Sequence, residues 1–180
     1  MDLSGGAGSS EALPITRGFV LAGGLSRRFG SDKAVAELEG QPAVVTLVRR
    51  LEEAGLVGTV VWRVSRPELG VREIIEGGVT LGPPGASGDD RHPLFGLAAI
   101  GGDEDVFVCP CDAVNLTVEM VRRLCEAHAV SFDSPLCGVW PAALRCRAGE
   151  HAGSNRSVRS LAEGLRVLDV GSVGNRNERA

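Results

Sequence analysis

The sequence has no tyrosine, and aromatic residues make up only 4% of its 180 positions. Valine, alanine, leucine and glycine are abundant instead, which suits a compact core of alternating strands and helices. The net charge is −4, so no broad basic surface for nucleic acid is expected. Any anion site must therefore be built locally.

A long apolar run is also missing. No stretch approaches the roughly 18 to 20 apolar residues that a membrane-spanning helix needs. Residues 1–14 are rich in Gly and Ser, and they lack the basic start and apolar centre of a signal peptide. We therefore expect a flexible tail over residues 1–14, a single domain over residues 15–180, no membrane partner and a cytoplasmic location.

The five cysteines form no common motif. Their odd number leaves one unpaired in any complete disulfide scheme. One residue separates Cys109 from Cys111, rather than the two of common zinc and redox motifs. For these two and for Cys125, Cys137 and Cys146, we expect reduced thiols that pack as small hydrophobic groups, with a metal cluster as the alternative.

Strand and helix patterns alternate along the chain. Strands are predicted at residues 15–22, 57–64, 79–81, 105–109, 134–140 and 167–170. Helices are predicted at residues 42–54, 93–100 and 157–164 and after Thr117 and Pro141, whereas residues 66–78 are weakly helical. This order predicts an α/β fold in which crossover helices connect parallel strands.

The most informative segment follows the first predicted strand. Residues 21–34 read Leu-Ala-Gly-Gly-Leu-Ser-Arg-Arg-Phe-Gly-Ser-Asp-Lys-Ala. Glycines let backbone N–H groups approach a phosphate closely, and the cationic side chains neutralise its charge. The Walker pattern is excluded because Ser31 rather than lysine follows Gly30, and the dinucleotide pattern Gly-x-Gly-x-x-Gly is absent. We expect a nucleoside triphosphate site at this first turn, where α/β sheets place ligands.

A second signal is Asp112, which follows the apolar residues 106–109 and the pair Pro110-Cys111. A carboxylate at the end of a buried strand is costly to desolvate unless something pairs with it. Magnesium is a natural partner because it takes one or two carboxylates together with phosphate oxygens. A helix cap or a loop acid is the alternative interpretation of this residue.

The segment from Leu21 to Lys33 resembles the nucleotidyltransferase signature Leu-Ala-Gly-Gly-x-Ser-x-Arg-x-Gly-x-Asp-Lys. Within that superfamily the chain looks most like the molybdenum cofactor guanylyltransferases. Pro110-Cys111-Asp112, the segment Pro93-Leu94-Phe95-Gly96 and the C-terminal Asn175-Arg176-Asn177 are similar to further motifs of that family. The resemblance implies a Rossmann-like three-layer sandwich with a mostly parallel central sheet.

The resemblance also implies a reaction. GMP would pass from GTP to the terminal phosphate of Mo-molybdopterin, and pyrophosphate would leave. Molybdoenzymes or cofactor-delivery proteins would be further partners. Mg²⁺ would be held by Asp112 and Asn177, with Asn175 as an alternative to the asparagine. Arg28, Lys33 and Asp112 would serve catalysis, and the acceptor pocket would lie near residues 135–140. The implied nucleotide-binding residues are Leu21, Ala22, Gly23, Gly24, Ser26, Arg28, Lys33, Pro93, Gly96 and Asp112.

Several positions depart from the family pattern. His92 replaces a glycine, Arg63 lies nearest the place of an asparagine, and residues 113–116 read Ala-Val-Asn-Leu instead of a proline-containing sequence. The family's nucleotide-contacting Asp has no counterpart in residues 79–82. Asp89 or Asp90, later in the chain, would have to take its place. Two alternatives therefore stand beside the guanylyltransferase. They are a relative that uses CTP or a sugar-phosphate acceptor, and a noncatalytic nucleotide-binding protein of the same fold.

Overall fold

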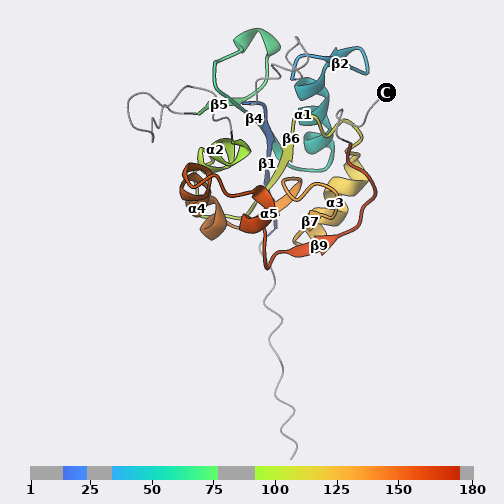
Figure 1. The fold of residues 1–180 in the computed structure, drawn as a ribbon. Helices are drawn as coiled ribbons and strands as arrows, with labels where there is room; N and C mark the ends of the chain where they lie inside the picture. The colour runs from blue at the N-terminus through green and yellow to red at the C-terminus, as the bar shows by residue number, and fades with distance from the viewer. Residues whose placement is uncertain (1–13, 24–33, 77–91, 175–180) are drawn as a thin grey trace, which may run out of the picture.

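The computed structural model describes residues 14–23, 34–76 and 92–174. Seven strands form one sheet in the order β5-β4-β1-β6-β8-β7-β9 (Figure 1). These strands are β1 (Arg17–Leu21), β4 (Val57–Trp62), β5 (Glu73–Ile75), β6 (Val106–Pro110), β7 (Ala129–Ser131), β8 (Gly138–Trp140) and β9 (Arg166–Leu168). A separate two-stranded hairpin comprises β2 (Glu37–Leu38) and β3 (Gln41–Pro42).

Six of the seven strands run in the same direction. β1 pairs in parallel with β4 and β6, β4 with β5, and β7 with β9. Only β8 is reversed, because it pairs antiparallel with both β6 and β7. This confirms the mostly parallel sheet that the resemblance implied.

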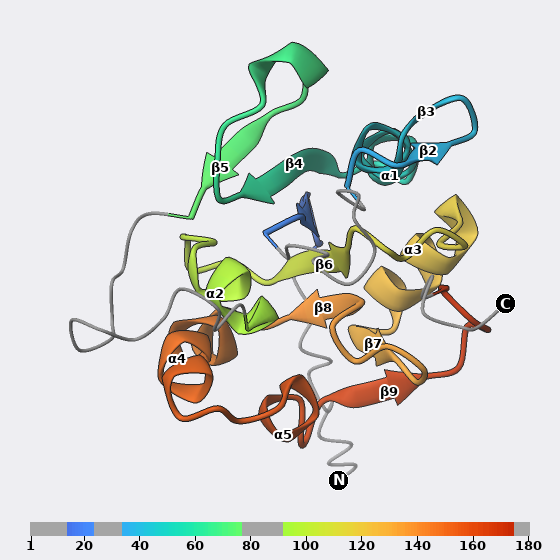
Figure 2. The ribbon, with the colours of Figure 1, turned by 45° about the horizontal axis from the view of Figure 1, so that its top comes forward.

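Helices cover both faces of the sheet and give three layers. α1 (Ala43–Glu53) and α3 (Val118–Glu126) pack on one face, whereas α2 (Pro93–Ala98), α4 (Ala142–Gly153) and α5 (Val158–Leu161) pack on the other (Figures 1 and 2). In β1, Val20 faces the α1 and α3 layer, and its neighbours Phe19 and Leu21 face the α2 and α4 layer. A parallel strand buried on both faces is apolar throughout for this reason.

The two longer helices of the first layer follow from their sequences. In α1, Val44, Leu47, Val48 and Leu51 recur at helical spacing and are buried. The helix ends before Gly55, whose φ of 98° favours glycine. At the start of α3, the Thr117 hydroxyl accepts a hydrogen bond from the Met120 N–H at 3.2 Å, which confirms its predicted capping role.

The structure corrects the sequence prediction in several short elements. Residues 66–78 are predicted to be weakly helical, but the described part of this segment, residues 66–76, contains a 3₁₀ turn at Pro67–Leu69 followed by strand β5. β7 and the β2–β3 hairpin were missed, because each of their strands is only two or three residues long. The strand expected over residues 134–140 is confined to Gly138–Trp140. The strand expected at residues 79–81 lies outside the described residues.

A buried guanidinium fastens the amino end of β6. The Arg145 side chain is only 2% exposed, and it donates hydrogen bonds to the carbonyl oxygens of Glu104 and Gly102 at 2.9 Å each. A third bond reaches the Trp140 carbonyl at 3.4 Å. Arg145 thus ties α4 to the residues that lead into β6.

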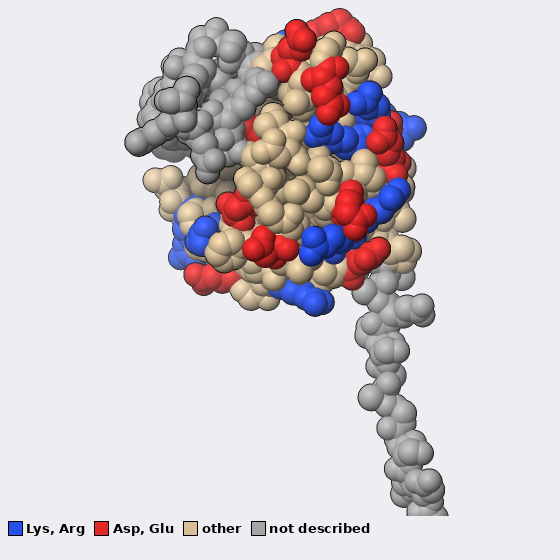
Figure 3. Space-filling view, turned by 90° about the vertical axis from the view of Figure 1, so that its right-hand side faces the viewer, with Lys and Arg blue, Asp and Glu red and all other residues tan. Residues whose placement is uncertain are grey.

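The surface shown in Figure 3 carries positive and negative side chains intermixed, without a large area of one sign. This pattern fits the modest net charge of the sequence. In the described parts of the chain, no helix is long and apolar enough to cross a membrane.

Candidate active site

The carboxyl ends of four parallel strands meet at one edge of the sheet. There Leu21, the last residue of β1, is paired with Val61 of β4 and Pro110 of β6. After β1 the chain continues to β4 on one side, and it later returns to β6 on the other side (Figure 2). β1 therefore ends at a topological switch point, where open α/β sheets bind ligands.

Both ends of the predicted phosphate loop are fixed at this edge. Ala22 donates to the Val61 carbonyl at 2.9 Å, and Gly23 follows directly. At the far end, Ala34 is buried and its carbonyl accepts from the Val44 N–H at 3.1 Å, at the start of α1. Of the predicted residues, Gly24, Ser26, Arg28, Lys33 and Asn177 lie outside the described residues, and their roles stay predictions.

Asp112 lies at the same edge, directly beyond β6. The preceding Cys111 N–H donates to the Leu21 carbonyl at 3.0 Å, so backbone pairing between β1 and β6 continues to the residue before Asp112. The Asp112 side chain is partly buried. A single carboxylate at the mouth of a phosphate loop suits Mg²⁺, which takes its other ligands from phosphates and water.

The segment that contains Pro93 and Gly96 forms α2, whose first turn is capped by His92. The Nδ1 atom of His92 accepts a hydrogen bond from the Leu94 N–H at 3.3 Å. Burial lowers the pKa of His92, which favours the neutral ring that this acceptor role requires. His92 is therefore the N-cap of α2.

Gly96 brings the backbone of α2 close to the end of β1. A Cβ built on Gly96 would lie 3.4 Å from Cδ2 of Leu21 and 2.9 Å from Oε1 of Glu76. An alanine here would displace the Glu76 carboxylate and would be in van der Waals contact with Leu21. Gly96 thus packs closely beside the end of β1, whereas Pro93 is exposed at the start of the helix. Contact of either residue with a nucleotide stays a prediction.

Glu76 is the residue that the sequence analysis missed. It follows β5, where its N–H donates to the Trp62 carbonyl, at 2.6 Å, and its carboxylate lies between Gly23 and Gly96. Arg63 forms an ion pair with it, with Nε 3.5 Å from Oε2. Burial raises the pKa of the Glu76 carboxyl, and the charge of Arg63 opposes this in part.

Comparison with known proteins assigns this arrangement to a family. Residues 18–165 match the MobA-like NTP transferase domain. The chain belongs to this family. It is a nucleotidyltransferase, so the family assignment speaks against the alternative of a noncatalytic nucleotide-binding protein.

Two curated relatives extend the match to most of the chain. The chain is 31% identical over 171 residues to the "Molybdenum cofactor guanylyltransferase" of Xanthomonas euvesicatoria pv. vesicatoria, with 91% of this chain and 76% of that protein covered. It is 32% identical over 168 residues to the "Probable molybdenum cofactor guanylyltransferase" of Thermococcus gammatolerans, with 80% of this chain and 82% of that protein covered.

Solved structures share the fold. A protein of Aquifex aeolicus superimposes with a TM-score of 0.70 at 18% identity, covering 93% of this chain and 96% of that one. Molybdopterin-guanine dinucleotide biosynthesis protein A of Archaeoglobus fulgidus gives a TM-score of 0.61 at 15% identity, with 86% of this chain and 82% of that chain covered. At such low identity these likenesses support the α/β architecture only.

Within this MobA-like domain, Glu76 is an acid beside Gly23, and it lies three residues before the segment in which the family pattern has its nucleotide-contacting Asp. The sequence analysis sought that acid in residues 79–82 or at Asp89 and Asp90, all of which lie outside the described residues. A usable signal was present: Glu76 directly follows the apolar pair Ile74-Ile75. That signal was hidden because the segment was read as weakly helical.

The acceptor side needs a correction. An acceptor pocket near residues 135–140 is expected at the carboxyl ends of parallel strands, but β8 runs antiparallel to β6. Gly138 is paired with Val108, near the site edge, whereas Trp140 is paired with Val106 at the other end of β6. Trp140 is fully buried and donates to the Leu136 carbonyl at 3.1 Å. Only the start of this segment lies toward Asp112.

The cysteines follow the expectation of free thiols, with one exception. None of the five forms a disulfide, and no three His, Cys, Asp or Glu side chains within residues 14–23, 34–76 and 92–174 are grouped to hold a metal ion. Cys109 and Cys137 are buried, and burial raises the pKa of both thiols. Cys146 is exposed rather than buried, because it lies on the outer surface of α4.

Proposed function

We propose that the protein transfers GMP from GTP to the phosphate of Mo-molybdopterin and releases pyrophosphate. The observation that carries the proposal is the shared edge of β1 and β6, from which both the Gly-rich loop and Asp112 emerge. The family match and the names of the two curated relatives support the same reaction.

In this proposal the loop at residues 24–33 binds the triphosphate. Arg28 and Lys33 neutralise the charge that develops on the leaving pyrophosphate. An oxygen of the acceptor phosphate forms a bond to the α-phosphorus, and the bond from that phosphorus to the β-phosphate oxygen breaks. Because the acceptor phosphate is already anionic, no protein nucleophile or general base is required.

Asp112 and Asn177 would hold Mg²⁺, which neutralises phosphate charge when it is bound. The described part of the site fits this ion, since Asp112 supplies a partly buried carboxylate and its backbone neighbours are fixed to β1. The described chain that leads toward Asn177 runs beside the residues after Asp112, with the Asn115 N–H donating to the Val173 carbonyl at 2.9 Å.

Glu76 would receive the nucleoside. Its carboxylate is an acceptor pair held at the exit of β1, beside the backbone of Leu21, Ala22 and Gly23. The Watson–Crick edge of guanine offers two neighbouring N–H donors, whereas cytosine and adenine each offer a single amino group. A carboxylate that accepts from both guanine donors would therefore favour GTP.

Calorimetric titration with GTP, CTP and ATP, each with Mg²⁺, tests the proposal. We expect tightest binding of GTP and a loss of that preference in Glu76→Ala. A preference for CTP would shift the assignment to a cytidylyltransferase, in which Arg63 would be a candidate for base contact. A protein that binds none of the three nucleotides would contradict the proposal.

A further inference from the structure

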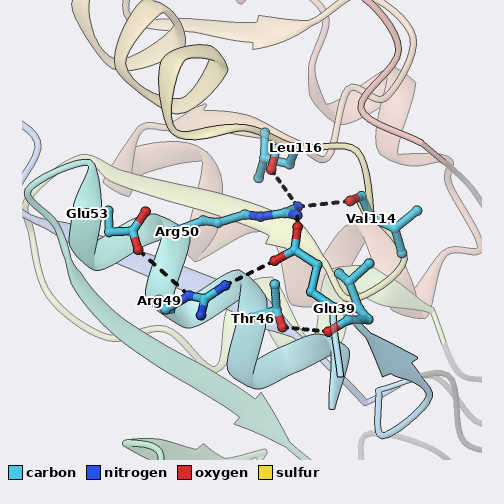
Figure 4. Close-up of polar contacts among 8 residues, drawn as sticks. Glu39, Thr46, Arg49, Arg50, Glu53, Val114 and Leu116 are labelled. Atoms are coloured by element: carbon cyan, nitrogen blue, oxygen red, sulfur yellow. Dashed lines mark hydrogen bonds and ion pairs between the residues drawn. The ribbon is translucent and has the colours of Figure 1, made fainter. Parts of the chain in front are cut away.

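Arg50 of α1 makes contacts that reach beyond its own helix (Figure 4). Its Nη1 atom donates to the carbonyl oxygens of Val114 and Leu116, at 2.9 and 2.8 Å. Its Nη2 atom donates to Oε1 of Glu39 at 2.6 Å, and the side chain is only 14% exposed. One guanidinium therefore joins α1, the β2–β3 hairpin and residues 113–116.

Residues 113–116 are the stretch that begins directly after Asp112. Two turn bonds shape it, from the Ala113 N–H to the Pro110 carbonyl and from the Leu116 N–H to the Ala113 carbonyl. Ala113 and Leu116 are buried on the sheet, which leaves the carbonyls of Val114 and Leu116 for Arg50. The backbone on the carboxyl side of Asp112 is thus held by a side chain from another element.

The opposite side of this stretch is held by the C-terminal segment. The Asn115 N–H donates to the Val173 carbonyl at 2.9 Å. A Cβ built on Gly174 would lie 2.9 Å from Nδ2 of Asn115, so the two segments are in direct contact. Residues 113–116 are therefore clamped between α1 and the chain that leads to Asn177.

The orientation of Arg50 is itself fixed. Glu39, which accepts from it, lies in the two-residue turn of the hairpin, where Glu39 and Gly40 have φ values of 55° and 78°. Glu39 also pairs with Arg49, whose Nη2 atom lies 3.0 Å from Oε2. A planar guanidinium held by three hydrogen bonds loses little additional freedom when the site is occupied.

We propose that Arg50 is a positioning residue for the metal carboxylate: by holding the Val114 and Leu116 carbonyls, it fixes the backbone that presents Asp112. This rests on the proposed role of Asp112 in binding Mg²⁺. Residues that orient metal ligands from outside the coordination shell typically change metal affinity by about 10- to 100-fold when they are removed. Because Arg50 acts through the backbone, we expect the lower end of that range.

The test measures Mn²⁺ binding by electron paramagnetic resonance, with a nonhydrolysable GTP analogue present. We expect Arg50→Ala to weaken Mn²⁺ binding about 10-fold and to leave metal-free binding of the analogue unchanged. Arg50→Lys retains the charge and can still donate to one or two of the three acceptors, so its loss should be smaller. The lysine variant also keeps the test available if the alanine variant does not fold.

Two residues of the same helix provide matched controls. Arg49→Ala removes a side chain that pairs with the same Glu39 and with Glu53 but makes no bond to residues 113–116. Thr46→Val removes the buried hydroxyl that donates to the Leu38 carbonyl at 3.0 Å, so it loosens the contact of α1 with the hairpin. Neither variant should change Mn²⁺ affinity, although Thr46→Val should lower the unfolding temperature.

Asp112→Asn separates the two levels of the proposal. If it weakens Mn²⁺ binding and Arg50→Ala does not, the role of Arg50 is overturned and that of Asp112 stands. If Asp112→Asn leaves Mn²⁺ binding intact, the metal assignment fails and the inference about Arg50 fails with it. Equal losses of Mn²⁺ affinity in Arg50→Ala and Thr46→Val would show a general effect on the fold and would also overturn it.

Discussion

The carboxylate of Glu76 lies directly against the α-carbon of Gly23, so that a Cβ at position 23 would overlap its Oε1 atom. Two strands that are not neighbours, β1 and β5, thereby meet at the candidate nucleoside site. The carboxylate can occupy this place only because position 23 has no side chain; a Cβ there would displace it. The contact also places an acid beside Gly23, one of the residues that the family resemblance implies for nucleotide binding.

Gly23→Ala should therefore displace the Glu76 carboxylate. Because the overlapping atoms are at the far end of a flexible side chain, we expect a stability loss below about 1 kcal/mol. Affinity for GTP should fall about 10-fold, equivalent to about 1.4 kcal/mol, as measured by calorimetry. Gly101→Ala is the control, since a Cβ there meets nothing within 4 Å.

A double-mutant cycle identifies the route of that effect. If Gly23→Ala acts by moving Glu76, it should cost little further affinity in a Glu76→Ala background. Fully additive losses would mean that the alanine obstructs the nucleotide directly and that Glu76 has no part in the effect.

The second prediction concerns the pH dependence of stability. Burial raises the pKa of Glu76 in the folded protein. Its contribution to stability is therefore present below the unfolded carboxyl pKa of about 4.3, and it is lost as the pH rises through the higher folded pKa. The stability advantage of Glu76→Gln over the parent protein should grow between about pH 4 and pH 7.

Thermal unfolding of both proteins at several pH values, without nucleotide, measures this difference. The same Glu76→Gln variant should bind GTP more weakly at pH 7, which would make Glu76 a group that costs stability and serves binding. If the parent protein instead becomes more stable relative to the variant as the pH rises, the ion pair with Arg63 outweighs the effect of burial.

The third prediction concerns the amino end of β6. Arg145→Met would leave the Gly102 and Glu104 carbonyls without their buried donor, and methionine cannot replace it. We expect a loss of about 3 kcal/mol in the free energy of unfolding, measured by urea denaturation. Arg147→Met, an exposed change on the same helix, should stay within about 0.5 kcal/mol of the parent.

The fourth prediction concerns thiol reactivity. Burial raises the pKa of Cys125 to about 12, and it raises the pKa values of Cys109 and Cys137 as well. These thiols hold almost no reactive thiolate at pH 8, whereas Cys146 is exposed. An aromatic disulfide reagent should therefore modify Cys146 first in the native protein.

Cys146→Ser provides the check on that assignment. The variant should lose the fastest phase of the reaction with the reagent and keep its unfolding temperature. Survival of the fast phase would show that a different thiol is the accessible one.

The sequence predicted the parts of the fold that depend on long apolar patterns. β1, α1, β4 and β6 were expected close to their observed positions, because each buries a continuous face or strand. β5 and β7 have three residues each, too few for periodicity to distinguish them from turns or weak helix. The reversed direction of β8 depends on pairing between distant segments, which no local pattern specifies.

Part of the candidate site could be located from the sequence. Asp112 and Gly96 belong to motifs that the chain retains, and the structure brings both to the end of β1, whereas their roles in binding stay predictions. No motif predicted Glu76, because it follows a strand of only three residues, and its neighbours Gly23 and Gly96 come from elements far away in the sequence. The anchoring of residues 113–116 by Arg50 likewise depends on a contact across 64 to 66 positions of the chain.

The most direct test of the account is pyrophosphate release from GTP, measured with and without Mo-molybdopterin in the presence of Mg²⁺. We expect release that requires the acceptor, that is faster with GTP than with CTP or ATP, and that falls by at least about 100-fold in Asp112→Asn. Release with CTP alone, or equal rates in the parent protein and Asp112→Asn, would contradict the proposed guanylyltransferase and the role of its metal carboxylate.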